Sequence, residues 1–264
     1  MTRRTLFTCS LVLVAGRVFA QAPTPATQAP AVPLGAGRAT LTPEEVAARA
    51  RAQQERLLLD WPNLARYRSQ NAELAAPAPG ENRVVFYGDS ITDGWGRVQG
   101  AFFPGKPYVN RGISGQTTAQ MVVRFRQDVV ALKPKVVVIL AGTNDIAGNT
   151  GPATPEMIQD NFMSMADIAK ANDIRVVLSS ILPASDYPWK PGMDPGPKIV
   201  AMNTWLKEYA ARRGLVYLDY YSAVVDDKLG MRAELASDGV HPTKAGYDIM
   251  SPLAERAIAE ALKR

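Results

Sequence analysis

The sequence predicts an α/β domain in which a buried parallel β-sheet carries helices on both faces. Strands that are apolar along their whole length and alternate with helices of roughly 10–20 residues are typical of a parallel sheet that is buried on both faces. Four short, mostly β-branched runs have this character, and a fifth is weaker. The four runs are Arg83–Tyr87, Lys135–Leu140, Ile174–Leu178 and Leu215–Leu218, and the weaker one is Tyr108–Asn110.

The first helix is predicted to begin at Pro43. Thr42 suits the N-cap position, Pro43 the first helical position, and Glu45 completes a capping box. The chain has 264 residues, and we see no internal repeat and no second change of composition after this point. We therefore predict one domain, 42–264.

Four further helices are predicted between and after the strands. Apolar residues recur there at helical spacing, as in Ile158, Phe162 and Met165. Met157 and Met163 on the same helix are also expected in the core. The helices are expected near Thr117–Leu132, Pro155–Asn172, Pro197–Arg213 and Pro242–Lys263.

The first 20 residues have the pattern of a cleaved signal peptide. Arg3 and Arg4 precede an apolar stretch, Leu6–Ala15, which is too short to span a bilayer. Small residues end the segment at Ala20, so we predict cleavage before Gln21 and a secreted or periplasmic protein, with Sec and twin-arginine export both open. A core helix is the alternative, but the Pro- and Ala-rich linker 21–41 could not continue one.

Removing this segment changes the charge balance. The whole chain has 30 Lys and Arg against 25 Asp and Glu, a net charge of +5. The segment holds three Arg and no acid, so 27 basic residues face 25 acidic ones and the net charge falls to +2. This balance gives no reason to expect a nucleic-acid partner, and no later apolar run is long enough for membrane insertion.

The scarce residues limit the chemistry. The chain has one Cys, Cys9, which lies in the predicted signal peptide, and one His, His241. These counts exclude a disulfide framework, a Cys-rich metal site and a multi-histidine metal site. An imidazole acid or base in this chain has to be His241.

A serine follows the first buried strand. Gly88, Asp89 and Ser90 stand where parallel α/β folds place their functional loops, and a helix beginning there would supply backbone N–H groups. Ser90 is therefore a candidate nucleophile. The alternative is that Ser90 only caps the helix.

The C-terminal loop offers the partners that such a serine needs. Asp238 and His241 are three residues apart in a loop before a helix, so the carboxylate could orient the ring while the other ring nitrogen faces a nucleophile. A surface ion pair is the alternative. Gly115, in a glycine-rich loop, and Asn144, after the predicted strand Lys135–Leu140, could donate hydrogen bonds to an oxyanion, or simply form turns.

These four blocks together resemble the SGNH (GDSL-type) hydrolase family. They are Gly88-Asp89-Ser90, Gly115 within Asn-x-Gly-x-x-Gly, Gly142-Thr143-Asn144-Asp145 and Asp238-x-x-His241, and the resemblance extends over roughly residues 80–264. Ile91 stands where the family name has Leu. The resemblance implies a flavodoxin-like three-layer α/β/α sandwich with a five-stranded parallel sheet.

The same resemblance implies a serine esterase mechanism without a cofactor or metal. By position, Ser90 is the nucleophile, His241 the general base and Asp238 the residue that orients it. The oxyanion hole is then formed by the backbone N–H groups of Ser90 and Gly115 and the side-chain amide of Asn144.

Three rival sites are weaker. Gly100–Lys106 resembles a P-loop, but Pro107 replaces the residue that would bind Mg²⁺. Asp93, Asp145, Asp238 and His241 could form a metal site, although the serine pattern explains them better. Ser114 is a rival nucleophile, but its flanking glycines favour a donor loop.

The predicted substrate is a small-molecule or glycan ester with a short acyl group such as acetyl. Trp95, Tyr187 and Trp189 lie near predicted strand ends and could stack on sugars, or they could be packing residues. A lysophospholipase or thioesterase and an inactive binding module of the same fold are the alternatives. Oligomeric state stays open.

Overall fold

The computed structural model describes residues 42–264. The predicted signal peptide and the linker lie outside the described residues. The chain divides into two compact units, Met1–Val46 and Ala47–Arg264. In the described part of the first unit, the Thr42 N–H donates to Glu45 Oε2 over 2.8 Å and the Glu45 N–H to Thr42 Oγ1 over 3.2 Å, so the predicted capping box is present.

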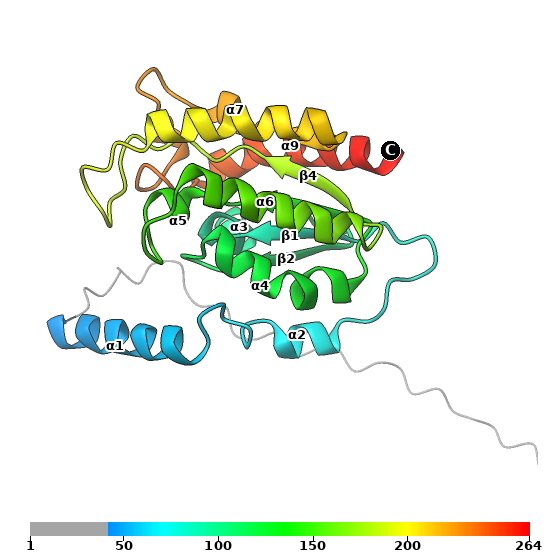
Figure 1. Cartoon of the computed structure of the whole chain (residues 1–264), viewed down its shortest axis with the longest axis horizontal. Coiled ribbons are helices and arrows are strands. Elements are labelled where there is room, and N and C mark those ends of the chain that lie inside the picture. The colour runs from blue at the N-terminus through cyan, green and yellow to red at the C-terminus, as the bar shows by residue number, and fades with distance from the viewer. Residues whose placement is uncertain (1–41) are drawn as a thin grey trace, which may run out of the picture. The chain divides into compact units, whose positions relative to one another are not determined.

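The larger unit contains a five-stranded parallel sheet with the strand order β2-β1-β3-β4-β5. Figure 1 shows the strands β1, β2 and β4 of this sheet among the helices. All four neighbouring pairs are parallel, which confirms the predicted fold class. The strands are β1 (Val84–Gly88), β2 (Tyr108–Gly112), β3 (Val136–Leu140), β4 (Arg175–Ser179) and β5 (Val216–Leu218).

Helices make up most of the remaining described chain. The α-helices are α1 (Pro43–Leu59), α2 (Arg68–Glu73), α3 (Ser90–Gln99), α4 (Thr118–Asp128), α5 (Thr143–Ile146), α6 (Pro155–Lys170), α7 (Gly196–Arg213), α8 (Tyr221–Val224) and α9 (Lys244–Lys263). Two 3₁₀ turns are η1 (Val130–Leu132) and η2 (Ala233–Leu235). No helix within residues 42–264 has both the length and the apolar character that crossing a membrane requires.

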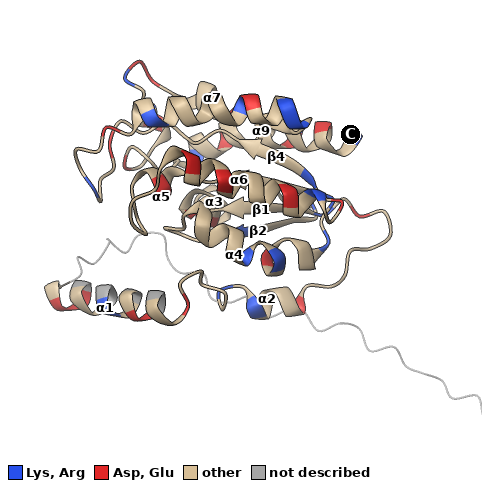
Figure 2. Ribbon diagram, viewed as in Figure 1, with Lys and Arg blue, Asp and Glu red and all other residues tan. Residues whose placement is uncertain are grey.

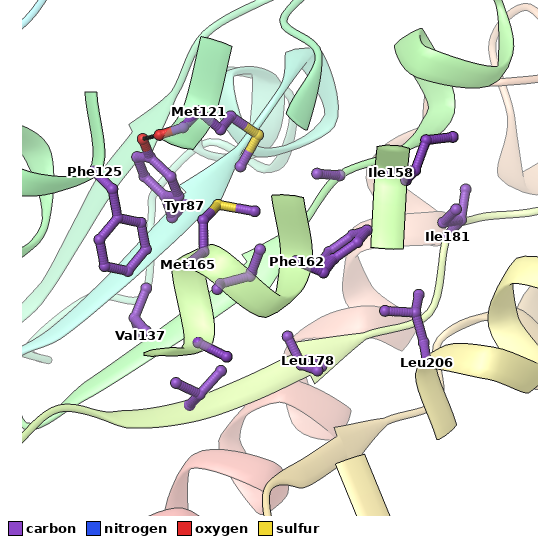
Figure 3. Packing of buried hydrophobic residues seen from close by; sticks show 14 of the residues in the cluster. Tyr87, Met121, Phe125, Val137, Ile158, Phe162, Met165, Leu178, Ile181 and Leu206 are labelled. Carbon is purple, nitrogen blue, oxygen red and sulfur yellow. Dashed lines mark hydrogen bonds between the residues drawn. The ribbon is translucent and has the colours of Figure 1, made fainter. Parts of the chain in front are cut away.

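Two hydrophobic clusters lie on opposite faces of the sheet and give the fold its three layers. On one face, Val85 and Tyr87 of β1 belong to a cluster with buried residues of α4, α6 and α7 (Figure 3). On the other face, Val84 and Phe86 belong to a cluster with buried residues of α3 and α9. Alternate residues of one strand thus enter alternate layers, which explains why the strands are apolar throughout.

The predicted elements appear with small shifts at their ends. The predicted helix Thr117–Leu132 is α4 followed by η1, and the last helix starts at Lys244 because the Thr243 side chain caps it. Met165 is buried, but Met157 is 55% exposed, so its predicted place in the core was wrong. Met157 lies in the first turn of α6, where its sulfur instead faces the Thr154 N–H at 3.5 Å.

The parallel register brings the carboxyl ends of the strands to one edge of the sheet. Gly88 is paired with both Gly112 and Leu140, so the loops that follow β1, β2 and β3 begin side by side. Most charged residues lie on helices and loops (Figure 2), and the strands β1 and β3 carry none. This edge is where a parallel α/β fold places its functional groups.

Candidate active site

Ser90 is the first residue of α3, and only Asp89 separates it from the end of β1. The helix is capped by Asp89, whose side chain accepts a hydrogen bond from the Ile91 N–H over 3.0 Å. The alternative in which Ser90 serves as the cap is therefore wrong, and its hydroxyl is available for another partner.

Glycine is required where α3 passes over the sheet. A Cβ on Gly88 would lie 2.2 Å from Thr92 Oγ1 and 2.6 Å from the Leu140 carbonyl oxygen. A Cβ on Gly112 would lie 2.1 Å from the Asp93 nitrogen. The start of α3 thus packs directly on the ends of β1 and β2, and this close packing sets the position of Ser90.

The partner of Ser90 comes from the far end of the chain. Ser90 Oγ lies 2.8 Å from His241 Nε2, and His241 Nδ1 lies 2.8 Å from Asp238 Oδ2. The loop that holds the pair is closed by the Ser237 N–H, which donates to the His241 carbonyl over 2.9 Å. The structure brings together the serine, histidine and aspartate predicted from the sequence, in hydrogen-bonding order.

Asp238 is held in its charged form by its own loop. Its second oxygen, Oδ1, accepts the backbone N–H of Val240 at 3.1 Å and that of His241 at 2.8 Å. Partial burial opposes the charged form, but these hydrogen bonds and the one from the His241 ring outweigh it and lower the pKa of Asp238. A charged carboxylate at Nδ1 selects the tautomer that leaves Nε2 free to accept a proton from Ser90.

Gly115 lies in the loop after β2. It has a positive φ of 79°, a conformation that glycine adopts without strain. The loop is tied to the serine loop because the Ile113 N–H donates to the Gly88 carbonyl over 3.0 Å.

Asn144 lies in α5, after β3, and is buried. Its side-chain nitrogen donates to the Gln116 carbonyl over 3.0 Å and approaches Asp89 Oδ2 at 3.3 Å. Its side-chain oxygen accepts from Asn149 Nδ2 over 2.6 Å. The Asn144 amide therefore links the loops that follow β1, β2 and β3.

Asp89 is a site residue to which sequence reasoning gave no role. Its carboxyl group is fully buried beneath the serine loop, and burial raises its pKa to about 7, partly offset by the Ile91 hydrogen bond and the positive field of His241. Its position next to Ser90 was the available signal, but the residue type alone does not reveal burial.

Arg124 is a second such residue. It is completely buried and pairs with Asp128 at 3.1 Å. Its guanidinium donates to the Gly88 carbonyl over 3.0 Å and the Arg111 carbonyl over 2.9 Å, and also to Gln116 Oε1. It also lies over the Tyr87 ring, 4.2 Å from the centroid. An arginine on an amphipathic helix is typical of a solvated surface, so the sequence gave no signal for this role.

Two of the three predicted substrate aromatics are not at the surface. Trp95 is 1% exposed and packs among Phe86, Phe103 and Tyr247 beneath α3, because its position in the helix faces the sheet. Tyr187 is 0% exposed. Neither ring can stack on a substrate in this structure, so the predicted direct contacts of Trp95 and Tyr187 were wrong.

Trp189 differs from these two residues. It is 42% exposed, stacks on Tyr187 with ring centroids 5.0 Å apart, and lies 6.1 Å from the His241 ring. Its indole N–H donates to Asn149 Oδ1 over 3.1 Å. Buried Tyr187 thus supports an exposed indole beside His241.

The rival sites are dispersed or differently engaged. Ser114 donates to Asp93 Oδ2 over 2.6 Å, and Asp145 accepts the Thr118 N–H over 3.0 Å, so both side chains are engaged by other partners. Lys106 pairs with Glu255 at 3.2 Å, just before β2 begins and therefore at the opposite edge of the sheet from Ser90. Among residues 42–264, no group of three or more His, Cys, Asp or Glu is placed to hold a metal ion.

Comparison with known proteins identifies the family that this chain matches. The model of the GDSL-like lipase/acylhydrolase family matches residues 86–249, which include Ser90, Gly115, Asn144, Asp238 and His241. Among solved structures, the chain is similar to a GDSL-like lipase of Bacteroides thetaiotaomicron, with 45% identity and a TM-score of 0.74 over 76% of this chain and 100% of that one.

Two similar proteins carry the name acetylxylan esterase. The one from Xylanibacter ruminicola is 26% identical over a match of 221 positions that covers 69% of this chain and 44% of that protein. The one from Geobacillus stearothermophilus is 28% identical over a match of 203 positions that covers 64% of this chain and 90% of that protein. This chain thus matches less than half the length of the Xylanibacter protein.

Proposed function

The chain belongs to the GDSL-like lipase/acylhydrolase family, and we propose that it is a carboxylic ester hydrolase whose catalytic triad is Ser90, His241 and Asp238. The observation that best supports this proposal is the pair of 2.8 Å contacts that connect Ser90 Oγ to His241 and His241 to Asp238. In this role Ser90 forms a covalent acyl intermediate.

The reaction has two halves. Ser90 Oγ attacks the ester carbonyl carbon while His241 Nε2 takes the hydroxyl proton, and His241 then passes that proton to the departing alcohol oxygen as the acyl–alcohol bond breaks. In the second half, His241 takes a proton from water, the resulting hydroxide attacks the acyl carbon, and the proton returns to Ser90 Oγ as the free acid leaves. Asp238 stays ionised and stabilises the protonated ring.

The oxyanion that forms in each half requires hydrogen-bond donors. We assign the backbone N–H groups of Ser90 and Gly115 and the side-chain NH₂ of Asn144 to this task. The positions of these groups at the ends of three adjacent strands support the assignment, as do the hydrogen bonds that fix Asn144. An oxyanion within reach of Asn144 Nδ2 would replace its long 3.3 Å contact with Asp89.

The proposed substrate is a carbohydrate that carries a short acyl ester, in particular acetyl. Two similar proteins named acetylxylan esterase support this class, and so does the half-exposed Trp189 ring beside His241. Aromatic rings present an apolar face that suits the C–H face of a sugar, while their edges leave the hydroxyl groups hydrated.

Export through the signal peptide is part of this proposal. The basic start of the chain at Arg3 and Arg4, the apolar stretch Leu6–Ala15 and the small residue at Ala20 support it. An esterase for glycan substrates would then meet them outside the cytoplasm.

A labelling experiment combined with a substrate series tests the proposal. A fluorophosphonate probe should label the wild-type protein but not Ser90→Ala, and Ser90→Ala should retain the wild-type melting temperature. Equal labelling of the variant would exclude Ser90 as the nucleophile, and no labelling of the wild type would favour a binding module. p-Nitrophenyl esters of increasing acyl length should give the highest kcat/KM for acetate, whereas a preference for long chains would favour a lysophospholipase or thioesterase.

A further inference from the structure

A cavity of about 280 Å³ lies beside residues 113–117, the loop between β2 and α4 that contains Gly115 and that we call the oxyanion loop. Two tryptophans contribute to the lining of this cavity. Gly115 contributes from the loop after β2, Trp189 from the loop after β4, and Trp61 from the segment that follows α1. The 6.1 Å separation of Trp189 and His241 places one side of this cavity next to the reacting groups. Trp61 lies outside residues 86–249, the part of the chain that the family model matches.

Trp61 has the exposure of a binding residue. It is 39% exposed, close to the 42% of Trp189, whereas Trp95 is 1% exposed. A large aromatic side chain that remains half exposed beside a polar cavity has apolar surface that a ligand can cover.

The segment that carries Trp61 is fixed on the oxyanion loop and on α4. Gln120 Nε2 donates to the Trp61 carbonyl over 2.5 Å, and Gln116 Nε2 donates to the Pro62 carbonyl over 2.6 Å. Further along the segment, the Tyr67 hydroxyl donates to the Gly112 carbonyl. Because Gln116 also accepts from buried Arg124, the segment is joined to the network beneath Ser90. The Trp61 side of the cavity is thus preorganised.

A turn at the start of the segment adds polar groups. The Asp60 carboxylate accepts the backbone N–H groups of Leu64 and Ala65 at 2.8 and 2.9 Å, and Asn63 adopts a positive φ of 57°. Asp60, Asn63 and Asn149 all contribute to the cavity lining. Carboxylate and amide groups beside two indole rings offer hydrogen bonds to hydroxyl groups and apolar faces to the ring of one sugar.

The chemistry of the lining argues against an acyl chain as the occupant. Ile113 is the one aliphatic side chain that the cavity exposes among residues 42–264, and most of the other lining residues are polar or aromatic. The volume is near the lower end of the roughly 300–1,000 Å³ typical of ligand pockets, which suits one sugar ring better than a long lipid.

We propose that Trp61 and Trp189 form two aromatic sides of a sugar subsite, which binds a carbohydrate ring of the alcohol part of the ester next to the scissile bond. This inference rests on the proposed carbohydrate esterase function. The segment Asp60–Tyr67, upstream of the family match, acts in this role as a specificity element rather than as part of the triad.

The test compares a substrate that fills the subsite with one that does not. Trp61→Ala should lower kcat/KM for O-acetylated xylotriose by about tenfold, the order expected for a lost aromatic stacking contact, and leave kcat/KM for p-nitrophenyl acetate within about twofold. Trp61→Phe should recover most of the activity on O-acetylated xylotriose. Leu58→Ala, which removes another exposed apolar side chain three residues earlier, is the matched control and should change neither substrate. Melting temperatures check that each variant is folded.

A binding measurement separates the failure of this inference from that of the proposed function. Unacetylated xylotriose should inhibit wild-type hydrolysis of p-nitrophenyl acetate, with an inhibition constant about tenfold higher for Trp61→Ala. If the wild type deacetylates O-acetylated xylotriose and Trp61→Ala does so equally well, the subsite is wrong and the proposed function stands. If the wild type neither deacetylates O-acetylated xylotriose nor binds xylotriose, both are wrong.

Discussion

The two halves of the candidate triad are held in contrasting ways. Ser90 lies over a buried network in which Asn144 and Arg124 join the loops after β1, β2 and β3. Asp238 and His241 lie in a more exposed loop whose hydrogen bonds run between residues two to four positions apart. The position of the proposed nucleophile therefore depends on the whole edge of the sheet, whereas the position of the proposed base depends on one local turn.

Substitutions in the loop that holds Asp238 and His241 should therefore lower activity without lowering stability. Replacing His241 with Ala should lower kcat by about 10⁴–10⁶, because the chain has no other imidazole to replace it. The melting temperature should change by no more than about 2 °C, since the side chain is 32% exposed and its hydrogen bonds join it to Ser90 and Asp238. Steady-state kinetics with p-nitrophenyl acetate and a thermal melt check both. A large loss of stability would contradict the contrast between the two regions.

Buried Arg124 should show the opposite behaviour. Arg124→Met should lower the free energy of unfolding by about 3–5 kcal/mol, because it leaves Asp128 buried without its charged partner. The double variant Arg124→Met/Asp128→Leu should recover part of that loss, which urea unfolding would reveal. If the single substitution leaves the free energy of unfolding unchanged, the buried network beneath Ser90 does not stabilise the fold.

Asn144 is both a proposed oxyanion donor and a link between the loops after β1, β2 and β3. Asn144→Ala should lower kcat by about 10²–10³, the loss typical of one oxyanion donor, with a smaller change in KM. Asn144→Asp retains the shape but replaces the NH₂ donor with an acceptor, so it should be at least as inactive. Activity of either variant near the wild-type level would remove Asn144 from the oxyanion hole.

Asp89 should affect the pH dependence of stability, because its carboxyl group is buried. Its pKa is about 7 in the folded protein against 3.8 for the free side chain, so between about pH 4 and 7 the folded state holds a proton that the unfolded state has lost. This carboxyl therefore makes the protein less stable as pH rises through that window. Burial also raises the pKa of Asp145, which adds to the same trend.

Substitution of Asp89 isolates this contribution. Asp89→Asn should flatten the fall in unfolding free energy between pH 4 and 7, whatever constant cost the new amide adds. Urea unfolding at several pH values gives the slope directly. An unchanged slope would show that Asp89 is already ionised across this range.

The sequence predicted the fold and the catalytic candidates better than the substrate contacts. Ser90, Asp238 and His241 follow short patterns at loop positions, and strand ends in a parallel sheet must meet at one edge. Trp95 and Tyr187 were misplaced because an aromatic residue near a strand end can face the core or the solvent, and residue type alone does not distinguish the two. Arg124 escaped detection because its burial depends on partners far apart in the chain.

The central claim is a covalent acyl intermediate on Ser90, and a trapping measurement tests it most directly. The wild-type protein is quenched with acid during turnover of p-nitrophenyl acetate, digested and examined by peptide mass spectrometry. We predict one acetyl group on the peptide that contains Ser90, and none on that peptide from Ser90→Ala. An acetyl group on the peptide containing Ser114 instead, or a Ser90→Ala variant that turns over at the wild-type rate, would contradict the assignment.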